Sequence, residues 1–473
     1  MSELTLLLRN ARAVVGDQTV WCDIGVAGHR IAAIVPWGSD ELSADRVVDA
    51  EGCWVIPGAL DTHAHIGQVA PEYESRDGLD SEANFSWESR AALSGGVTTA
   101  LNYLKFSQGP MLDMLARQRA AAARHCLIDL LFHGYIMNGD HQAELPDAVR
   151  HGIRSFKIFL PYRGEEARSL GGISSLNYGE LQLALRALRK LGAQALIHAE
   201  DGDIVDLSTK ALMAGGGDGT LDDWEASRPT AAEGTASFAA LYLAKRERAK
   251  VAIVHVSSNE AVLASKAFPD VDVTLESCPH YLALSVEDGL GAIGKVAPPV
   301  RHRHDMEALW EAVDEGRIAF FGSDHNVWPE EAKCAVWTAK AGLPGIDLML
   351  PLLLTKACAE RGIPIHRVVE MTSTNAARRF GLYPQKGSIE VGADADLVIL
   401  DTGQRKVRAE ASVSAVDYSP YEGTVLKMWP RTTIRRGAVL YDDGKFFEEQ
   451  AAQCVVLNDG FVADDDGSQA SGR

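Results

Sequence analysis

Two histidines separated by one residue, His63 and His65, follow the apolar stretch WVIPGAL at residues 54–60. In an extended chain, side chains two residues apart project to the same face. Two imidazoles on one face are able to bind a divalent cation such as zinc. The same pair is also compatible with two ordinary polar residues at the end of a strand, so the rest of the chain has to decide.

Four other ionisable residues interrupt or close apolar runs elsewhere: Lys157 in SFKIFLP, His198 in LIHAED, His255 in IVHVSS and Asp324 in FFGSDHN. Each has an ordinary explanation when it is taken alone. A buried histidine is usually a hydrogen-bonded core residue, a lysine buries its stem while its amine reaches solvent, and an aspartate caps the next helix. Their occurrence together with the His63–His65 pair favours a shared metal site.

Lys157 and Asp324 could each take part in a more specific reaction at a metal site. An amine such as that of Lys157 is able to react with carbon dioxide, which gives an anionic carbamate that could bridge two metal ions. Asp324 beside a metal centre could bind one ion and also act as a base. We interpret His325, which follows Asp324, as a supporting or structural residue.

The elements that would position these residues are eight short β-rich runs in the middle of the chain, separated by helical patterns such as 178–192 and 234–249. The runs are 54–61, 97–104, 127–134, 155–161, 194–200, 251–257, 271–277 and 318–324. Continuous apolar runs alternating with helices predict parallel strands buried on both faces. Eight of them predict an α/β fold of the (β/α)₈ TIM-like barrel type, and the rival open sheet is disfavoured because no GxGxxG follows any run.

The catalytic chemistry of such barrels lies at the C-terminal ends of the strands. The two histidines of the pair follow the first run, and the other four candidates fall on the fourth, fifth, sixth and eighth runs. The sequence therefore predicts that all six side chains meet at one rim of the barrel.

The two ends of the chain have a different character, with short strands separated by Gly and Asp turns at 4–35, 386–401 and 432–446. We predict a small β-sandwich domain formed from residues 1–56 plus 385–450. The metal-dependent barrel would then occupy 57–384, and 451–473 would be a flexible C-terminal tail.

Composition limits the classes of partner. The net charge of −19 disfavours nucleic acid and anionic membranes as partners, since binding to them needs a basic face. No stretch resembles a secretory signal or a membrane span. The seven scattered cysteines form no CxxC pair, so we expect reduced thiols and a cytoplasmic location.

An ordered set of motifs spanning nearly the whole chain resembles the cyclic amidohydrolase branch of the amidohydrolase superfamily. The resemblance is strongest to the hydantoinase and dihydropyrimidinase family, with allantoinases and dihydroorotases as relatives. The motifs include VIPGALDTHAHIG, GIRSFKIFLPYRG, LIHAEDGDIVD, ESCPHYLAL, GSDHN, GLPGID and TSTNAARRFGLYPQKGSIEVGADADLVILD.

This resemblance implies metal-dependent hydrolysis of a cyclic amide or imide C–N bond at two divalent metal ions, usually zinc. His63, His65 and Asp324 would hold one ion, His198 and His255 the other, and a carbamate on Lys157 would bridge them. A hydroxide between the ions would attack the ring carbonyl, with Asp324 as the general base. Tyr162 matches the tyrosine that stabilises the oxyanion.

Departures from the family patterns bear on the substrate. HAHIGQV lacks the arginine that dihydroorotases carry after the histidine pair, which disfavours an orotate-like anion. The presence of Tyr162 favours the hydantoinase side over allantoinase, whereas ESCPHYL resembles the allantoinase form. Ala297 and Ala341 replace a serine and an asparagine that are common in hydantoinases, and the loop between Asp324 and GLPGID is short.

Three alternatives follow from the same comparison. The chain could be an allantoinase or a related enzyme for another ring. It could be a non-catalytic dihydropyrimidinase-like scaffold, although all six ligand positions hold competent residues. A deaminase of another branch would leave Lys157 without a role. By analogy with the family we expect a homo-oligomer, either a tetramer or a dimer.

Overall fold

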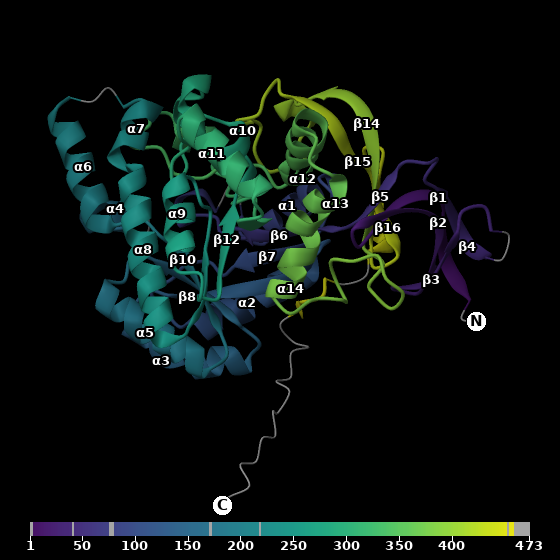
Figure 1. Cartoon of the computed structure of the whole chain (residues 1–473), viewed down its shortest axis with the longest axis horizontal. Helices are drawn as coiled ribbons and strands as arrows, with labels where there is room; N and C mark the ends of the chain where they lie inside the picture. The colour runs from purple at the N-terminus through teal and green to yellow at the C-terminus, as the bar shows by residue number, and fades with distance from the viewer. Residues whose placement is uncertain are drawn as a thin grey trace, which may run out of the picture.

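The computed structural model describes residues 3–39, 42–74, 80–169, 173–216, 219–451 and 454–457. Two units are visible in Figure 1: a barrel surrounded by helices, and a β-sheet domain at one end of the molecule, where purple N-terminal and yellow C-terminal strands lie together. The division into these units confirms the predicted fold class.

Eight parallel strands form the barrel, and each pairs with the next one in chain order from β6 to β13. They are β6 (Ala59–Ala64), β7 (Val97–Tyr103), β8 (Asp129–Ile136), β9 (Ser155–Phe159), β10 (Gln194–His198), β11 (Lys250–Ile253), β12 (Val273–Ser277) and β13 (Ile318–Phe321). The backbone N–H of His65 donates to the carbonyl of His325 at 3.0 Å, and Ala64 forms an isolated parallel bridge with His325. The two edge strands are thereby joined just beyond their ends.

Helices cover the outside of the barrel. They are α1 (Ala83–Ser94), α2 (Met111–His125), α3 (Gly139–Arg150), α4 (Gly164–Ser169), α5 (Tyr178–Lys190), α6 (Gly202–Ala214), α7 (Leu221–Ser227), α8 (Thr230–Glu247), α9 (Asn259–Ala267), α10 (Pro279–Ala283), α11 (Arg303–Asp314), α12 (Met349–Leu353), α13 (Ile365–Val369) and α14 (Asn375–Arg379). The predicted helix at 178–192 corresponds to α5. It begins at an Asn177–Glu180 capping box and buries Leu181, Ala184, Leu185 and Leu188, whose spacing gives one apolar face.

The second unit is a nine-stranded sheet built from both ends of the chain. Its strands are β1 (Leu4–Val15), β2 (Gln18–Ala27), β3 (Arg30–Pro36), β4 (Ala44–Asp49), β5 (Trp54–Pro57), β14 (Leu397–Lys406), β15 (Val425–Arg435), β16 (Ala438–Asp442) and β17 (Lys445–Phe446). Most neighbours are antiparallel, but β1 pairs in parallel with both β4 and β5. Apolar side chains of β1, β2, β14 and β15 form a core separate from that of the barrel.

The first predicted run, 54–61, proves to be two strands rather than one. Its first half is β5 of the small sheet, and its second half begins β6 of the barrel, with Gly58 between them. A side chain at Gly58 would place its Cβ 2.2 Å from Oγ1 of Thr98, so the chain crosses between the units at a position where only glycine fits.

Part of the predicted tail, residues 454–457, lies against the barrel. Cys454 and Leu457 are buried, and the N–H of Leu130 in β8 donates to the carbonyl of Val455 at 3.0 Å. Residues 458–473 lie outside the described part of the chain. Within that part, no helix combines the length and the apolar character needed to cross a bilayer.

Candidate functional site

A cavity of about 510 Å³ opens among the loops that follow the barrel strands. All seven residues singled out from the sequence line it: His63, His65, Lys157, Tyr162, His198, His255 and Asp324. They come from five barrel strands and the segments that follow them, β6, β9, β10, β11 and β13, so the folded chain brings together residues as far apart as 63 and 324.

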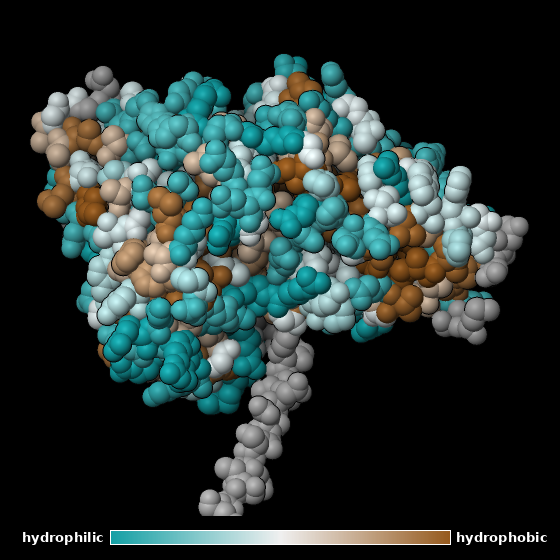
Figure 2. Space-filling view, viewed as in Figure 1, coloured by the Kyte–Doolittle hydropathy of each residue, from teal (hydrophilic) through white to brown (hydrophobic). Residues whose placement is uncertain are grey.

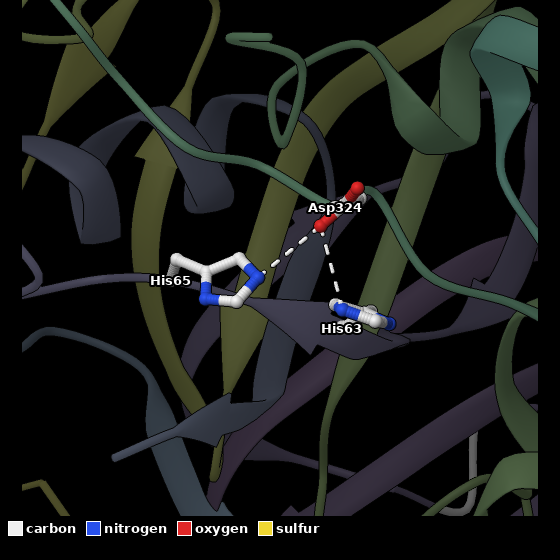
Figure 3. Close-up of side chains that lie close together, drawn as sticks. All are labelled: His63, His65 and Asp324. Carbon is white, nitrogen blue, oxygen red and sulfur yellow. Dashed lines mark hydrogen bonds and ion pairs between the residues drawn. The ribbon is translucent and has the colours of Figure 1, made fainter. Parts of the chain in front are cut away.

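His63, His65 and Asp324 form the tightest cluster, with one potential ligand atom from each lying within 4.8 Å of the others. Oδ1 of Asp324 lies 3.2 Å from Nε2 of His65 and 3.4 Å from Nε2 of His63. Figure 3 shows both imidazoles turned toward this carboxylate. The geometry is that of donor atoms converging on one point, as metal binding requires.

Lys157 lies between this cluster and the other two histidines. Its Nζ is 3.4 Å from Nε2 of His63 and 3.1 Å from Nε2 of His255. Burial lowers the pKa of Lys157 to about 8, although the negative charge of Asp324 opposes that shift. The amine is therefore more readily deprotonated than an exposed lysine.

His198 lies beside His255 in the cavity. Its ring centroid lies 4.4 Å from that of His255, and its Nε2 lies 2.6 Å from Oε2 of Glu200. Because Glu200 occupies Nε2, Nδ1 is the ring nitrogen of His198 that is left for another partner.

Tyr162 packs edge-on against His198, with ring centroids 5.5 Å apart. Burial raises the pKa of Tyr162, whereas the nearby Arg228 guanidinium opposes the rise. The phenol consequently stays protonated and is a hydrogen-bond donor at neutral pH.

Backbone conformation at two strand ends is unusual. His255 has φ of 42° and Asp324 has φ of 50°, the left-handed region that residues other than glycine seldom adopt. Such strain is concentrated at functional sites, where the surrounding structure imposes it. Here it follows directly after two parallel strands and turns both side chains into the cavity.

Asp61 secures the approach of β6 to the segment after β13. Its Oδ1 accepts the backbone N–H of His63 at 3.0 Å and that of Ser323 at 2.8 Å. A single buried carboxylate thus fixes the backbone at His63 and at Ser323, the residue before Asp324.

Three carboxylates behind the histidines were missed by the sequence reasoning. Oε1 of Glu276 lies 2.6 Å from Nδ1 of His63, Glu200 holds His198, and Oε2 of Glu88 lies 2.9 Å from Nε2 of His325. Carboxylates that hold the second nitrogen of a ligand histidine fix its tautomer and orientation. Glu276 carried a detectable signal, a charged residue inside the apolar run VTLES.

His325 itself lies outside the cavity lining. Its Nδ1 accepts backbone N–H groups of Gly345 at 3.1 Å and Ile346 at 3.3 Å, while its Nε2 faces Glu88. These contacts agree with the interpretation of His325 as a supporting residue that anchors the segment after Asp324.

The outer part of the cavity combines apolar and polar walls. Phe106, Phe159, Ile173 and Trp328 give it apolar surface, and Gln68, Lys105, Asn326 and Lys340 give it polar groups. Ala297 and Ala341, the two departures noted in the sequence, both face this space. Gln68, in the segment where dihydroorotases carry arginine, donates to the carbonyl of Tyr103 at 2.6 Å.

The residues present suit divalent metal ions. Burial and the charge of Lys157 hold the pKa values of His63 and His255 well below their ordinary value, so both imidazoles are neutral and offer lone pairs. Nδ1 of His65 and Nδ1 of His255 are also buried without a hydrogen-bond partner within the described residues. Neutral imidazoles beside a buried carboxylate are a donor set typical of zinc and similar ions.

Comparison with known families and proteins shows to which family the chain belongs. The profile of the amidohydrolase family matches residues 54–440. The chain belongs to this family. An allantoinase of Rubrobacter xylanophilus is 33% identical over 96% of this chain and 98% of its own length. An L-hydantoinase of Paenarthrobacter aurescens is 32% identical over 94% and 96%.

Solved structures of hydantoinases and dihydropyrimidinases have the same fold as this chain. The chain superposes on an L-hydantoinase from Arthrobacter aurescens with a TM-score of 0.85, at 31% identity and covering 94% of this chain and 97% of that one. The dihydropyrimidinase of Brevibacillus agri gives a TM-score of 0.86 at 29% identity, covering 96% and 98%. This amidohydrolase is therefore an enzyme of the cyclic amidohydrolase branch, which supports hydrolysis of a cyclic amide and not a scaffold role.

Proposed function

We propose that the enzyme opens the ring of a hydantoin or dihydropyrimidine type of cyclic amide at a binuclear metal centre. The observation that carries this proposal is the convergence of Lys157 with four histidines and Asp324 in one cavity, with Tyr162 at its edge. Hydantoinase and dihydropyrimidinase relatives of similar length support the class of ring.

His63, His65 and Asp324 would hold one ion, and His198 and His255 the other. Lys157 would join the two as a carbamate, formed when its neutral amine attacks carbon dioxide and loses a proton. Its lowered pKa favours that reaction because only the unprotonated amine has a free electron pair. Zinc or a similar ion bound there would lower the pKa of water and polarise the amide carbonyl.

Asp324 is suited to move the proton. Burial opposes its charged form, but the hydrogen bond and charge of His65 outweigh burial and lower the pKa of Asp324. It is therefore a carboxylate at neutral pH, able to take a proton from the attacking water and return it to the ring nitrogen that leaves.

Tyr162 would donate a hydrogen bond from its phenol to the carbonyl oxygen as negative charge develops there. The raised pKa of Tyr162 keeps that proton in place. Its position beside His198 puts the donor next to the ring nitrogens proposed to hold the second ion.

The experiment that tests the function combines metal analysis with a panel of rings. Protein purified without chelator should contain about two metal ions per chain. It should open dihydrouracil or 5-substituted hydantoins and should leave dihydroorotate intact, because HAHIGQV lacks the arginine that dihydroorotases carry after the histidine pair for the substrate carboxylate. Metal-free protein that opens none of the rings after zinc is added would refute the proposal.

Lys157→Ala should lose both bound metal and turnover, and added bicarbonate with a short carboxylic acid should restore part of the turnover. Lys157→Arg is the matched control for charge, since a guanidinium does not form the carbamate. Full turnover in Lys157→Arg would contradict the carbamate bridge, but it would not contradict metal binding by the histidines and Asp324.

Allantoin hydrolysis is the second candidate. The 33% identity to an allantoinase favours it, as does the ESCPHYL sequence, whose His280 is fully buried with neither ring nitrogen bonded within the described residues. Allantoin in the panel distinguishes the two candidates, because preferential turnover of allantoin would replace the hydantoin assignment.

A further inference from the structure

One wall of the cavity is a patch of residues without polar side chains, bordered by Lys340 and Asn326, which also line the cavity. It consists of Val296 and Ala297 on one segment and Ala341 and Gly342 on another. Any hydrogen bond from this wall to an amide ring must therefore come from the backbone, so the placement of these two segments decides what the wall can recognise.

A buried lysine outside the cavity lining joins the two segments. Lys333, only 4% exposed, donates from Nζ to the carbonyls of Lys295 at 3.0 Å, Lys340 at 2.9 Å and Gly342 at 2.8 Å. Burial and the charge of Lys295 lower the pKa of Lys333 to about 7, but three carbonyls from the two segments face its Nζ, which matches the three N–H donors of the ammonium form.

Neighbouring bonds complete this connection. The N–H of Gly342 donates to the carbonyl of Lys295 at 3.0 Å, and Nζ of Lys295 donates to the carbonyl of Trp337 at 3.2 Å. Nε1 of Trp328 donates to the carbonyl of Ala341 at 3.0 Å. The loop is thus held on both sides of Ala341, and none of these bonds uses the Ala341 N–H.

The chemistry of Lys333 argues against a purely stabilising role. A buried charge that is bonded only to neutral carbonyls is costly, and a packed apolar side chain of similar size is often as stable or more so. All three of its bonds go to residues that belong to this wall or directly precede a wall residue in the chain. The gain from retaining an ammonium here is the fixed geometry of that wall.

We propose that Lys333 is a positioning residue for substrate recognition, which holds the 295–297 and 340–342 segments in register so that their backbone groups meet the ring amide. This inference rests on the proposed ring-opening function. The short loop between Asp324 and GLPGID would thereby recognise the ring through backbone atoms that Lys333 holds in place.

The test is steady-state kinetics of Lys333→Met with the ring that the wild type opens best. The substitution keeps the length of the side chain and removes all three donors. We expect KM to rise about tenfold or more, since a small misplacement of recognition groups is costly. Metal content should be unchanged and kcat should stay within about threefold. Lys266→Met, which removes a lysine paired with Glu315 on the outer surface, is the control and should leave KM unchanged.

Hydrogen–deuterium exchange gives a readout that does not depend on activity. The peptide covering 338–343 should exchange faster in Lys333→Met than in the wild type, whereas the peptide covering 59–66 should not. A folded Lys333→Met variant with wild-type KM and wild-type exchange would overturn the proposal.

If Lys333→Met does not fold, Lys333→Arg carries the test. A planar guanidinium cannot reproduce three bonds from one nitrogen, so a smaller rise in KM with faster exchange is expected. Faster exchange with an unchanged KM would overturn the role in recognition. Failure of the wild type to open any ring would instead count against the proposed function, which keeps the two failures distinguishable.

Discussion

At the scale of single residues, the cavity depends on side chains that act in pairs. Each of two candidate ligand histidines has a carboxylate on its second nitrogen, Glu276 for His63 and Glu200 for His198. The carboxylates select which nitrogen faces the cavity, so the chemistry of the imidazoles is fixed before any ligand binds.

Tyr162→Phe removes one hydroxyl from the edge of the cavity. We expect kcat to fall about a hundredfold, the usual effect of deleting one oxyanion donor, with metal content unchanged. Metal analysis and kinetics on the same sample measure both. Tyr178→Phe, on the exposed start of α5, is the matched control. Wild-type turnover in Tyr162→Phe would contradict the assigned role.

At the scale of elements, the site depends on how closely β6 approaches the segment after β13. A Cβ added at Gly322 would lie 2.3 Å from Cβ of His63 and 2.8 Å from its backbone nitrogen. Because both nearest atoms are close to the main chain, β6 itself would have to move.

Gly322→Ala should therefore weaken metal binding and lower the free energy of unfolding by about 1–3 kcal/mol. Equilibrium denaturation and metal titration measure the two effects. Gly139→Ala, at the start of α3, is the control, since its added Cβ would meet no atom within 4 Å. Equal metal affinity in Gly322→Ala and the wild type would show that this approach does not position His63.

At the scale of the whole molecule, an internal ion cluster joins the small sheet to the barrel. Nζ of Lys386 lies 2.6 Å from Asp129 of β8, 3.1 Å from Asp394 and 2.6 Å from Asp396. Burial opposes the ammonium, but the three aspartates outweigh burial and raise the pKa of Lys386. The stabilisation is therefore present at neutral pH and is lost only as the pH rises through the raised pKa.

Lys386→Met should lower the free energy of unfolding by about 3–5 kcal/mol, because it removes the cation that three buried carboxylates share. Denaturant unfolding measures this loss, while kcat per metal-loaded site should not change. Lys210→Met, an exposed lysine paired with Asp206 on α6, should change stability by less than about 1 kcal/mol. Comparable stability of the two variants would show that the cluster does not hold the units together.

Several large apolar side chains are exposed on the surface of the molecule. Leu207 and Met213 of α6 and Phe238 and Tyr242 of α8 are each about half exposed or more, and Figure 2 shows brown surface on the α6 side and on the small sheet. The expected oligomer remains a prediction.

Much of the fold followed from local pattern. Strands buried on both faces read as continuous apolar runs, so the eight runs predicted the barrel, and the apolar spacing within 178–192 predicted the helix that the structure shows as α5. The single error among the runs lay at 54–61, where two strands of different units follow each other without an intervening loop. Only tertiary contacts, such as that of Gly58 with Thr98, separate them.

The sequence by itself determined which residue types could serve a metal centre and that they lie near strand ends, because the barrel places those ends at one rim. Only the tertiary structure decided which groups hold them. Glu276 reaches His63 across 213 positions of chain, Asp61 reaches Ser323 across 262 and Lys333 reaches Lys295 across 38, and no local pattern encodes a partner at such distances. The ligand candidates are thus a property of the sequence, whereas their orientation is a property of the packing.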